Sequence, residues 1–279
     1  MINFNNVSYY YKKKQPLYKS LNVEIPHGNI YGLLGKNGAG KTTMLKLIAG
    51  LIYPKTGSIS VMGHTPSDRM PELLEDIFIV PEELHVTDMS IQAYQNMYAP
   101  FYSKFDESQF NQYLNEFGVD KDQMLTGLSY GMKKKVLLSF GLATNTSLLI
   151  LDEPTNGLDI PSKSQFRKIL AGAITDDRTV IISTHQVRDM STLIDPIMII
   201  DKGQIIFKEN LEQVASKLKF TLYPSMTEPK DVLYAERVPG GFIGITENLD
   251  NEETDIDIEV LFNAIVSYPE TFTKLFENN

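Results

Sequence analysis

A glycine-rich octapeptide constrains the fold of this chain more than any other feature. Residues 35–42 read Gly-Lys-Asn-Gly-Ala-Gly-Lys-Thr and match the pattern G-x-x-x-x-G-K-[ST]. The apolar run before them, residues 30–34, is typical of a strand buried on both faces of a parallel sheet. After them, Met44, Leu45 and Ile48 fall on one face of a predicted helix. A strand, a glycine-rich loop and a helix in this order predict a phosphate-binding loop.

The residue types of this octapeptide suit that chemistry. Its glycines let backbone N–H groups close around phosphate oxygens, and the start of the helix adds partial positive charge. In such a loop Lys41 reaches the β- and γ-phosphates of a nucleotide, and the hydroxyl of Thr42 is a ligand for Mg²⁺. The sequence therefore predicts a site for a nucleotide together with Mg²⁺.

Two carboxylates follow another apolar run. Residues 147–151, Ser-Leu-Leu-Ile-Leu, predict a buried strand, and Asp152 and Glu153 come directly after it. A carboxylate at the carboxyl end of such a strand is placed to hold the Mg²⁺ shell, which fits Asp152. Glu153 is one residue further along and points elsewhere, so it is the candidate to polarise an attacking water.

Composition excludes several classes of site and partner. The 279 residues include no cysteine, which excludes disulfides, thiolate metal sites and cysteine nucleophiles. A formal net charge of −9 argues against nucleic acid or an anionic membrane surface as the partner. No stretch approaches the ~18–20 apolar residues of a membrane span, and the N-terminus lacks the features of a signal peptide. We expect a soluble, cytoplasmic chain with no nucleic-acid partner.

The pattern along the chain predicts an α/β fold with a mainly parallel sheet, because strand-like and helical segments alternate. Strand-like runs occupy most of residues 2–34 and return at residues 148–151, 180–183 and 197–200. Residues 85–145 differ from these runs, since their pattern is helical and rich in aromatic side chains. We interpret them as a helical insertion.

The last segment differs from the rest in charge. Residues 220–279 hold 12 acidic and 3 basic side chains, so they carry the whole net charge of −9. Within them, residues 237–244 predict a turn between two strands, and residues 256–276 predict helix. We therefore divide the chain into a domain of residues 1–219 and a small acidic α+β appendage of residues 220–279.

Three further motifs narrow the class of nucleotide-binding protein. Residues 128–132, Leu-Ser-Tyr-Gly-Met, resemble the LSGGQ signature of ABC ATPases. Residues 152–159 resemble the Walker B motif of that family running into its D-loop, which ends at Asp159. His185, after a third strand-like run, resembles the family's switch histidine. The chain thus resembles an ABC transporter ATP-binding subunit over roughly residues 2–215.

This resemblance implies a fold and a mode of ATP binding. The fold is a P-loop NTPase core of the ABC-ATPase type, in which an antiparallel β part accompanies the parallel sheet and residues 85–145 form a helical subdomain. Two copies face head to tail, as a homodimer or as a heterodimer with another ATPase subunit. ATP then lies between the phosphate loop of one copy and Ser129 and Gly131 of the other, and Glu153 and His185 promote hydrolysis.

Two places depart from the family's pattern. Tyr130 and Met132 replace a Gly and a Gln of the signature, and Glu82 stands where most members have the glutamine of the Q-loop. A Pro-Glu-Glu sequence at this place resembles exporters whose membrane subunit is a separate six-helix chain. We predict that Glu82 binds Mg²⁺ or orients water. The three lysines of residues 133–135 lie in the first turn of the signature's helix and face either phosphate or solvent.

The resemblance also completes the set of predicted site residues. The adenine is stacked on one of Tyr9, Tyr10 and Tyr11, of which a gapless match favours Tyr11, unless these tyrosines only cover the sheet edge. The predicted ATP-binding residues are Tyr11, Gly35, Asn37, Gly38, Ala39, Gly40, Lys41, Thr42 and Thr43. The predicted catalytic residues are Glu153, His185 and Glu82, and the predicted Mg²⁺ ligands are Thr42, Asp152 and Glu82.

The partner implied by the resemblance is an integral-membrane permease subunit, with export as the favoured direction. It would dock near residues 82–105 and hold the ATPase at the cytoplasmic face of the membrane. The main alternative is a soluble ABC-type ATPase acting on a cofactor-assembly scaffold or the ribosome. Asp152 follows Lys41 by 111 positions, and this stretch shows no sustained heptad, which disfavours the coiled-coil DNA-repair members. A regulatory P-loop switch is a third alternative, which Glu153 and His185 disfavour.

Overall fold

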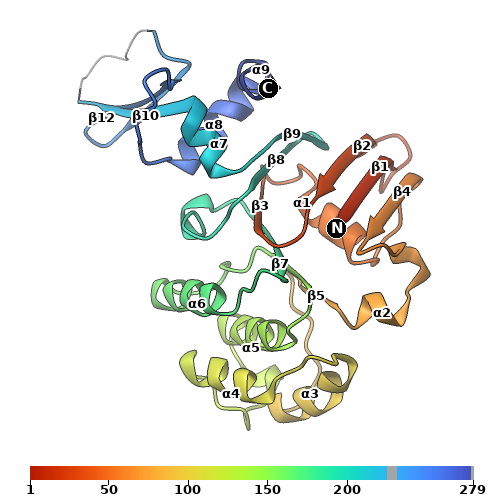
Figure 1. Cartoon of the computed structure of the whole chain (residues 1–279). Coiled ribbons are helices and arrows are strands. Elements are labelled where there is room, and N and C mark those ends of the chain that lie inside the picture. Colours follow the sequence, from red (N-terminus) through yellow and green to blue (C-terminus); the bar gives the residue numbers. More distant parts are fainter. Residues whose placement is uncertain (225–230, 278–279) are drawn as a thin grey trace.

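A computed structural model describes residues 1–224 and 231–277 and centres on a six-stranded sheet (Figure 1). The strands are β3 (Ile30–Leu34), β5 (Ile77–Val80), β6 (Leu148–Asp152), β7 (Thr179–Thr184), β8 (Ile197–Asp201) and β9 (Gln204–Glu209). Their order is β5-β6-β7-β3-β8-β9, and every neighbouring pair is parallel except β8 with β9. The predicted α/β fold with a mainly parallel sheet is confirmed.

The inner strands of this sheet are mainly apolar because both of its faces are covered. Along β6, Leu149 and Leu151 belong to one hydrophobic core, whereas Leu148 and Ile150 belong to a second core. Successive side chains of a strand point to opposite faces, so each short run supplies residues to both cores. This explains why residues 148–151 show no alternation of apolar and polar side chains.

One face of the central sheet is covered by a helix and a second sheet. The helix is α1 (Lys41–Ile48), which begins directly after the phosphate loop and buries Met44, Leu45 and Ile48. The second sheet is antiparallel, with order β2-β1-β4, and consists of β1 (Ile2–Tyr9), β2 (Tyr18–Ile25) and β4 (Thr56–Val61). A four-residue helix, α2 (Pro71–Leu74), leads into β5.

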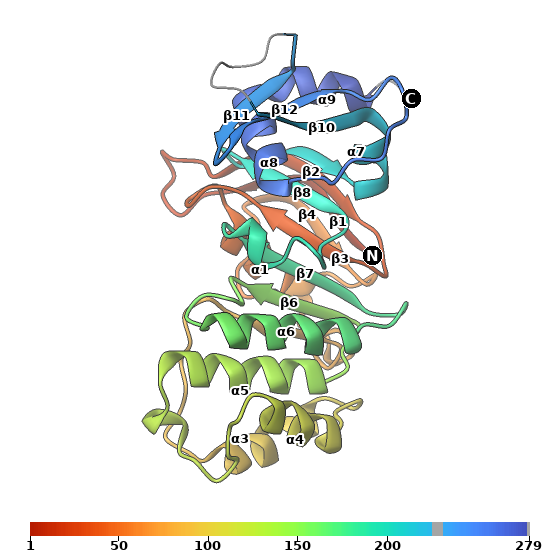
Figure 2. The same ribbon diagram turned by 90° about the vertical axis from the view of Figure 1, so that its left-hand side faces the viewer.

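The other face carries helices, three of which lie within the predicted helical insertion of residues 85–145. They are α3 (Ile91–Tyr98), α4 (Glu107–Glu116), α5 (Tyr130–Ala143) and, after β6, α6 (Ile160–Gly172). In Figure 2, α6 lies next to the sheet, α5 follows, and α3 and α4 lie furthest away. Phe140 of α5 contacts the rings of Phe78, Tyr94 and Phe105, so this layer has its own aromatic centre. The helices α3, α4 and α5 thus form a helical subdomain on this face of the central sheet.

Arg178, just before β7, joins the ends of two of these helices. Its guanidinium is 3% exposed and donates to the carbonyls of Gly141 and Leu142 near the end of α5, each at 3.0 Å. It also donates to the carbonyl of Ala173 after α6, at 3.4 Å. Burial lowers the pKa of Arg178 to about 10. A cation at the carbonyl ends of helices stabilises both dipoles.

We expect Arg178→Met to lower the free energy of unfolding by about 3 kcal/mol, because these carbonyls lose their donor inside the protein. The melting temperature, measured by circular dichroism, should fall by roughly 6–12 °C. Arg188→Met is the matched control, since the Arg188 side chain is 76% exposed. It should cost less than about 1 kcal/mol. Equal shifts in the two variants would contradict the role assigned to Arg178.

The chain after β9 forms a small α+β unit at the top of Figure 2. Its elements are α7 (Leu211–Lys217), β10 (Leu218–Tyr223), β11 (Tyr234–Val238), β12 (Gly241–Glu247), α8 (Ile258–Ser267) and α9 (Pro269–Glu277). The three strands form an antiparallel sheet of order β10-β12-β11. The predicted α+β character of the appendage is confirmed, including the turn between β11 and β12.

This unit is packed against the rest of the chain. Ile258 and Leu261 of α8 belong to the same hydrophobic core as Val187, and Arg188 forms an ion pair with Glu259. β10 begins at Leu218, directly after α7, so the proposed division of the chain between residues 219 and 220 falls inside this strand. The division of the chain into two domains stays a proposal.

Candidate functional site

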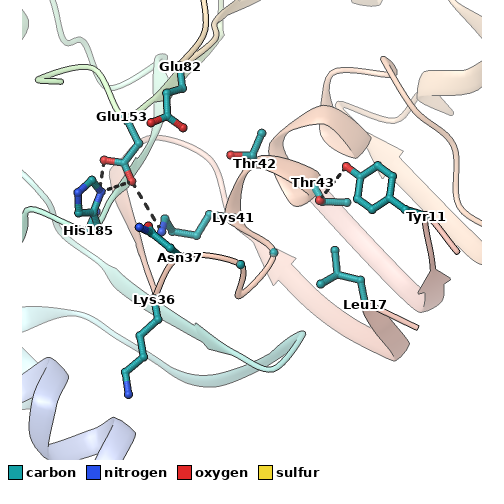
Figure 3. A pocket seen from close by; sticks show the side chains of 12 residues that line it. Tyr11, Leu17, Lys36, Asn37, Lys41, Thr42, Thr43, Glu82, Glu153 and His185 are labelled. Atoms are coloured by element: carbon teal, nitrogen blue, oxygen red, sulfur yellow. Dashed lines mark hydrogen bonds and ion pairs between the residues drawn. The ribbon is translucent and has the colours of Figure 1, made fainter. Parts of the chain in front are cut away.

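A cavity of about 470 Å³ lies beside the phosphate loop (Figure 3). Its lining combines the loop, the start of α1 and the residues after β1 with the segments that follow β5, β6 and β7. The lining residues are Tyr11, Leu17, Lys36, Asn37, Gly38, Gly40, Lys41, Thr42, Thr43, Glu82, Glu153 and His185. The structure therefore brings most of the predicted ATP-binding residues and all three predicted catalytic residues into one site.

The backbone of the phosphate loop is fixed by two side chains. Tyr18, which is fully buried, donates its hydroxyl to the carbonyl of Gly40 at 2.5 Å. Gly40 has φ +121°, and a Cβ there would lie 2.8 Å from the Tyr18 hydroxyl, so only glycine fits. Lys41 donates from Nζ to the carbonyl of Gly35 at 2.7 Å. The loop thus holds its Lys41 ammonium at the wall of the cavity.

Glu153 lies at the centre of the charged groups in this cavity. Its Oε1 is 2.8 Å from Nδ1 of His185 and 3.7 Å from Nζ of Lys41, and its Oε2 accepts from the backbone N–H of His185 at 3.3 Å (Figure 3). The residue is 3% exposed and has φ +47°. A positive φ is costly for a residue with a Cβ and is found at functional sites. A nearly dry carboxylate held in this way can accept a proton from water.

Asp152 lies at the end of β6 and is oriented by a residue that the sequence reasoning missed. Ser183 on β7 donates its hydroxyl to Asp152 Oδ1 and accepts from the backbone N–H of Glu153 at 3.1 Å. The parallel register pairs Asp152 with Ser183, which explains the contact. The available signal was the polar Ser183 at the end of an apolar strand, two residues before His185.

The residues predicted to hold Mg²⁺ are only partly gathered at the cavity. Thr42 and Glu82 line it, and both offer oxygen atoms, the donors that Mg²⁺ prefers. Asp152 is 2% exposed and is engaged by Ser183. Asn156 donates to Oε1 of Glu82 at 3.2 Å and leaves the other carboxylate oxygen available. This donor set suits an ion held mainly by nucleotide phosphates and water, as Mg²⁺ is.

Lys134 faces neither phosphate nor solvent, which were the two predicted alternatives. It is fully buried and donates from Nζ to the carbonyls of Pro81 at 3.1 Å and Glu82 at 3.4 Å. Burial lowers the pKa of Lys134 to about 8, while the carboxylates of Asp152, Glu82 and Glu153 raise it. The prediction failed because helical spacing does not show which segment covers a helix.

The three tyrosines near the end of β1 have different surroundings. Tyr9 is 6% exposed and belongs to a hydrophobic core, whereas Tyr11 is 65% exposed. The Tyr11 hydroxyl lies 3.1 Å from that of Thr43, at the end of the cavity opposite His185 (Figure 3). Of the three tyrosines, Tyr11 alone lines the cavity, so its exposed ring is the stacking surface that we predict for a base whose phosphates lie near Lys41. This contact stays a prediction.

Six predicted residues do not line this cavity: Gly35, Ala39, Asp152, Ser129, Gly131 and Asp159. Ser129 and Asp159 are the N-cap residues of α5 and α6, and each accepts from a backbone N–H of its own helix. The hydrogen bond from Ser162 lowers the pKa of Asp159. Gly131 packs against the backbone of Gly157, since a Cβ on it would lie 2.6 Å from that carbonyl. Both N-caps are exposed.

Comparison with known proteins identifies the family. The ABC transporter family profile matches residues 18–156. The lantibiotic transport ATP-binding protein SrtF of Streptococcus pyogenes is 33% identical over 224 residues, which cover 77% of this chain and 95% of that protein. The Nod factor export ATP-binding protein I of Burkholderia orbicola is 32% identical over 74% of this chain and 69% of that protein.

A solved structure agrees with this result at the level of the fold. The ATP-binding subunit of an ABC transporter superposes with a TM-score of 0.69 and 23% identity, over 77% of this chain and 91% of that chain. The predicted P-loop NTPase core is confirmed by this likeness. Given the phosphate loop, the buried Glu153 and the 33% identity to SrtF, the chain belongs to the ABC transporter family and is one of its ATP-hydrolysing subunits.

Proposed function

We propose that this chain hydrolyses ATP between two subunits and that closure of the pair drives an integral-membrane partner, with export as the favoured direction. One observation carries the proposal: Glu153 is held between Lys41 and His185 in the same cavity as the phosphate loop. A carboxylate that can accept a proton, a cation and a phosphate-binding loop thus line a single cavity. The functions for which the relatives are named, lantibiotic transport and Nod factor export, support the exporter assignment.

In the proposed mechanism the residues position the reactants and stabilise charge. Backbone N–H groups of the loop and Lys41 hold the β- and γ-phosphates of ATP. Mg²⁺, held by Thr42 and Glu82 with Asp152 in its outer shell, would neutralise phosphate charge when bound. Glu153 accepts a proton from the water that attacks the γ-phosphorus, and the bond between that phosphorus and the leaving oxygen of ADP breaks. His185 fixes the Glu153 carboxylate.

A second subunit would complete the site on its other side. Ser129 and Gly131 lie at the start of α5, where backbone N–H groups and the helix dipole favour an anion such as the γ-phosphate. Asp159 starts α6, and the next residue, Ile160, is 83% exposed. An exposed Ile beside two exposed helix N-termini supports burial of this surface in the ATP-bound dimer.

We propose that the membrane partner docks in a groove between α2, β5 and the end of α3. The groove has a volume of about 610 Å³. Its lining residues are Ala49, Leu51, Arg69, Pro71, Leu74, Glu75, Ile77, Phe78, Ile79, Tyr98, Pro100, Phe101 and Tyr102. Phe101 is 67% exposed, whereas Tyr94 contacts Phe140 in the aromatic centre. Of the predicted docking segment, residues 82–105, only the part from Tyr98 to Tyr102 lines this groove.

A separate membrane chain is the partner that this proposal requires. Within residues 1–224 and 231–277, no helix has both the length and the apolar character of a membrane span. Exposed apolar side chains gathered in one groove are typical of a protein contact site. We propose that the ATPase acts at the cytoplasmic face of the membrane through this contact.

The docking proposal predicts that Phe101→Glu separates the two proteins. Co-purification of the tagged ATPase with its membrane partner from detergent extract should fall roughly 30-fold, as for a buried aromatic at an interface. Tyr268→Glu, at a 54% exposed tyrosine after α8, is the matched control and should retain the partner. Recovery of a soluble protein in place of a membrane chain would instead favour the soluble ABC-type ATPase.

A further inference from the structure

Two positions at which this chain departs from the family's pattern lie in contact with each other. Tyr130 stands at a glycine position of the signature, and Glu82 stands where most members have glutamine. The hydroxyl of Tyr130 donates to the carbonyl oxygen of Glu82 at 2.5 Å, across 48 residues of sequence. We call residues 81–83 the Glu82 loop.

The ring of Tyr130 makes a second close contact. Gly157 has φ +79°, and a Cβ there would lie 2.4 Å from Cδ1 of Tyr130. The Tyr130 ring therefore occupies the space that a side chain at residue 157 would fill. Because Gly157 lies between Asn156 and Asp159, this contact joins the start of α5 to the turn that leads into α6.

Two further side chains, one on α5 and one on the turn after β6, also form hydrogen bonds with the Glu82 loop. Lys134, one turn along α5, donates to the Pro81 and Glu82 carbonyls, and its ammonium lies 5.9 Å from the centre of the Tyr130 ring. Asn156 donates to the Glu82 carboxylate at 3.2 Å. The Glu82 loop is thus bonded to α5 through its carbonyls and to the turn after β6 through its side chain.

We propose that Tyr130 is a positioning residue that fixes the Glu82 loop to the first turn of α5 within one subunit. This inference rests on the proposed function, because α5 presents Ser129 to the ATP of the second subunit while Glu82 lines the cavity for its own ATP. Movement of Glu82 when nucleotide binds would be transmitted to Ser129 through the Tyr130 hydroxyl. With a glycine at residue 130, the carbonyl oxygen of Glu82 would keep the hydrogen bond from Lys134 and lose the one from Tyr130.

Tyr130→Phe tests the proposal because it removes the hydroxyl and keeps the ring against Gly157. In the nucleotide-free protein, amide hydrogen exchange at residues 133–136 of α5 should become roughly fivefold faster, since one hydrogen bond that holds this turn is lost. ATP turnover should fall about tenfold through misplacement of Glu82, while the KM for ATP stays within about twofold. Tyr268→Phe, in the appendage, is the matched control and should change neither measurement.

The outcomes separate this inference from the proposed function. Unchanged exchange in Tyr130→Phe would overturn the positioning role, because a residue that only fills space keeps its ring in that variant. Faster exchange with unchanged turnover would overturn it as well, since Glu82 would then not depend on the hydroxyl. If the wild-type protein hydrolysed no ATP, the proposed function would fail, and the exchange measurement alone would decide whether Tyr130 fixes the loop.

Discussion

Glu153→Gln should lower ATP turnover by about 10²–10⁴-fold, the usual contribution of a positioned general base. The amide keeps the shape of the side chain and its hydrogen-bonding reach toward His185, but it cannot take a proton from water. That loss corresponds to about 3–5 kcal/mol in the activation free energy. The effect is large because Glu153 is 3% exposed, so bulk water does not replace its carboxylate.

The measurement is steady-state phosphate release together with a separate ATP-binding titration. Binding should persist in Glu153→Gln, because the groups that hold the phosphates, Lys41 and the loop backbone, are untouched. Glu247→Gln changes an exposed glutamate of the appendage and is the matched control. Turnover at the wild-type rate in Glu153→Gln would refute the base role and direct attention to Glu82.

Lys41→Met should weaken ATP binding by about 100-fold, because a charge-assisted hydrogen bond to phosphate is replaced by a neutral side chain of similar length. The Lys41 side chain is 7% exposed, so solvent cations do not substitute for its ammonium. The variant also removes the cation nearest to the Glu153 carboxylate, at 3.7 Å. Hydrolysis should therefore be lost even at saturating ATP.

Equilibrium titration of the nucleotide-free protein with ATP measures the first effect, and phosphate release at saturating ATP measures the second. Lys168→Met, at an exposed lysine of α6, is the matched control for loss of one positive charge. An unchanged ATP dissociation constant in Lys41→Met would show that the phosphates lie away from residues 35–42.

The phosphate loop was predictable because its parts are contiguous in sequence. Residues 30–34 form β3, the loop follows at once, and Lys41 begins α1, so no distant contact is needed to order them. The glycines indicate positions where the backbone takes a conformation that other residues rarely adopt, such as φ +121° at Gly40. The alternation of strand-like and helical segments likewise predicted the parallel sheet, and the short apolar runs indicated strands covered on both faces.

Contacts between distant segments were not predictable in the same way. Ser183 reaches Asp152 only because β6 and β7 pair in parallel with one particular register. Lys134 was predicted to face phosphate or solvent, but it is buried under the Glu82 loop, 52 residues away in sequence. Docking was predicted near residues 82–105, but the groove that we propose for it is also lined by Leu51 and Arg69.

The chemistry of the site could be read from the sequence alone: a phosphate loop, a carboxylate after a strand, and a histidine after the next strand. The sequence also determined the α/β class, because periodicity and glycine placement are local properties of the chain. The tertiary structure decided which of these groups touch. It placed His185 2.8 Å from Glu153 and Tyr130 against Glu82, because strand register and helix packing depend on complementary surfaces that lie far apart in the sequence.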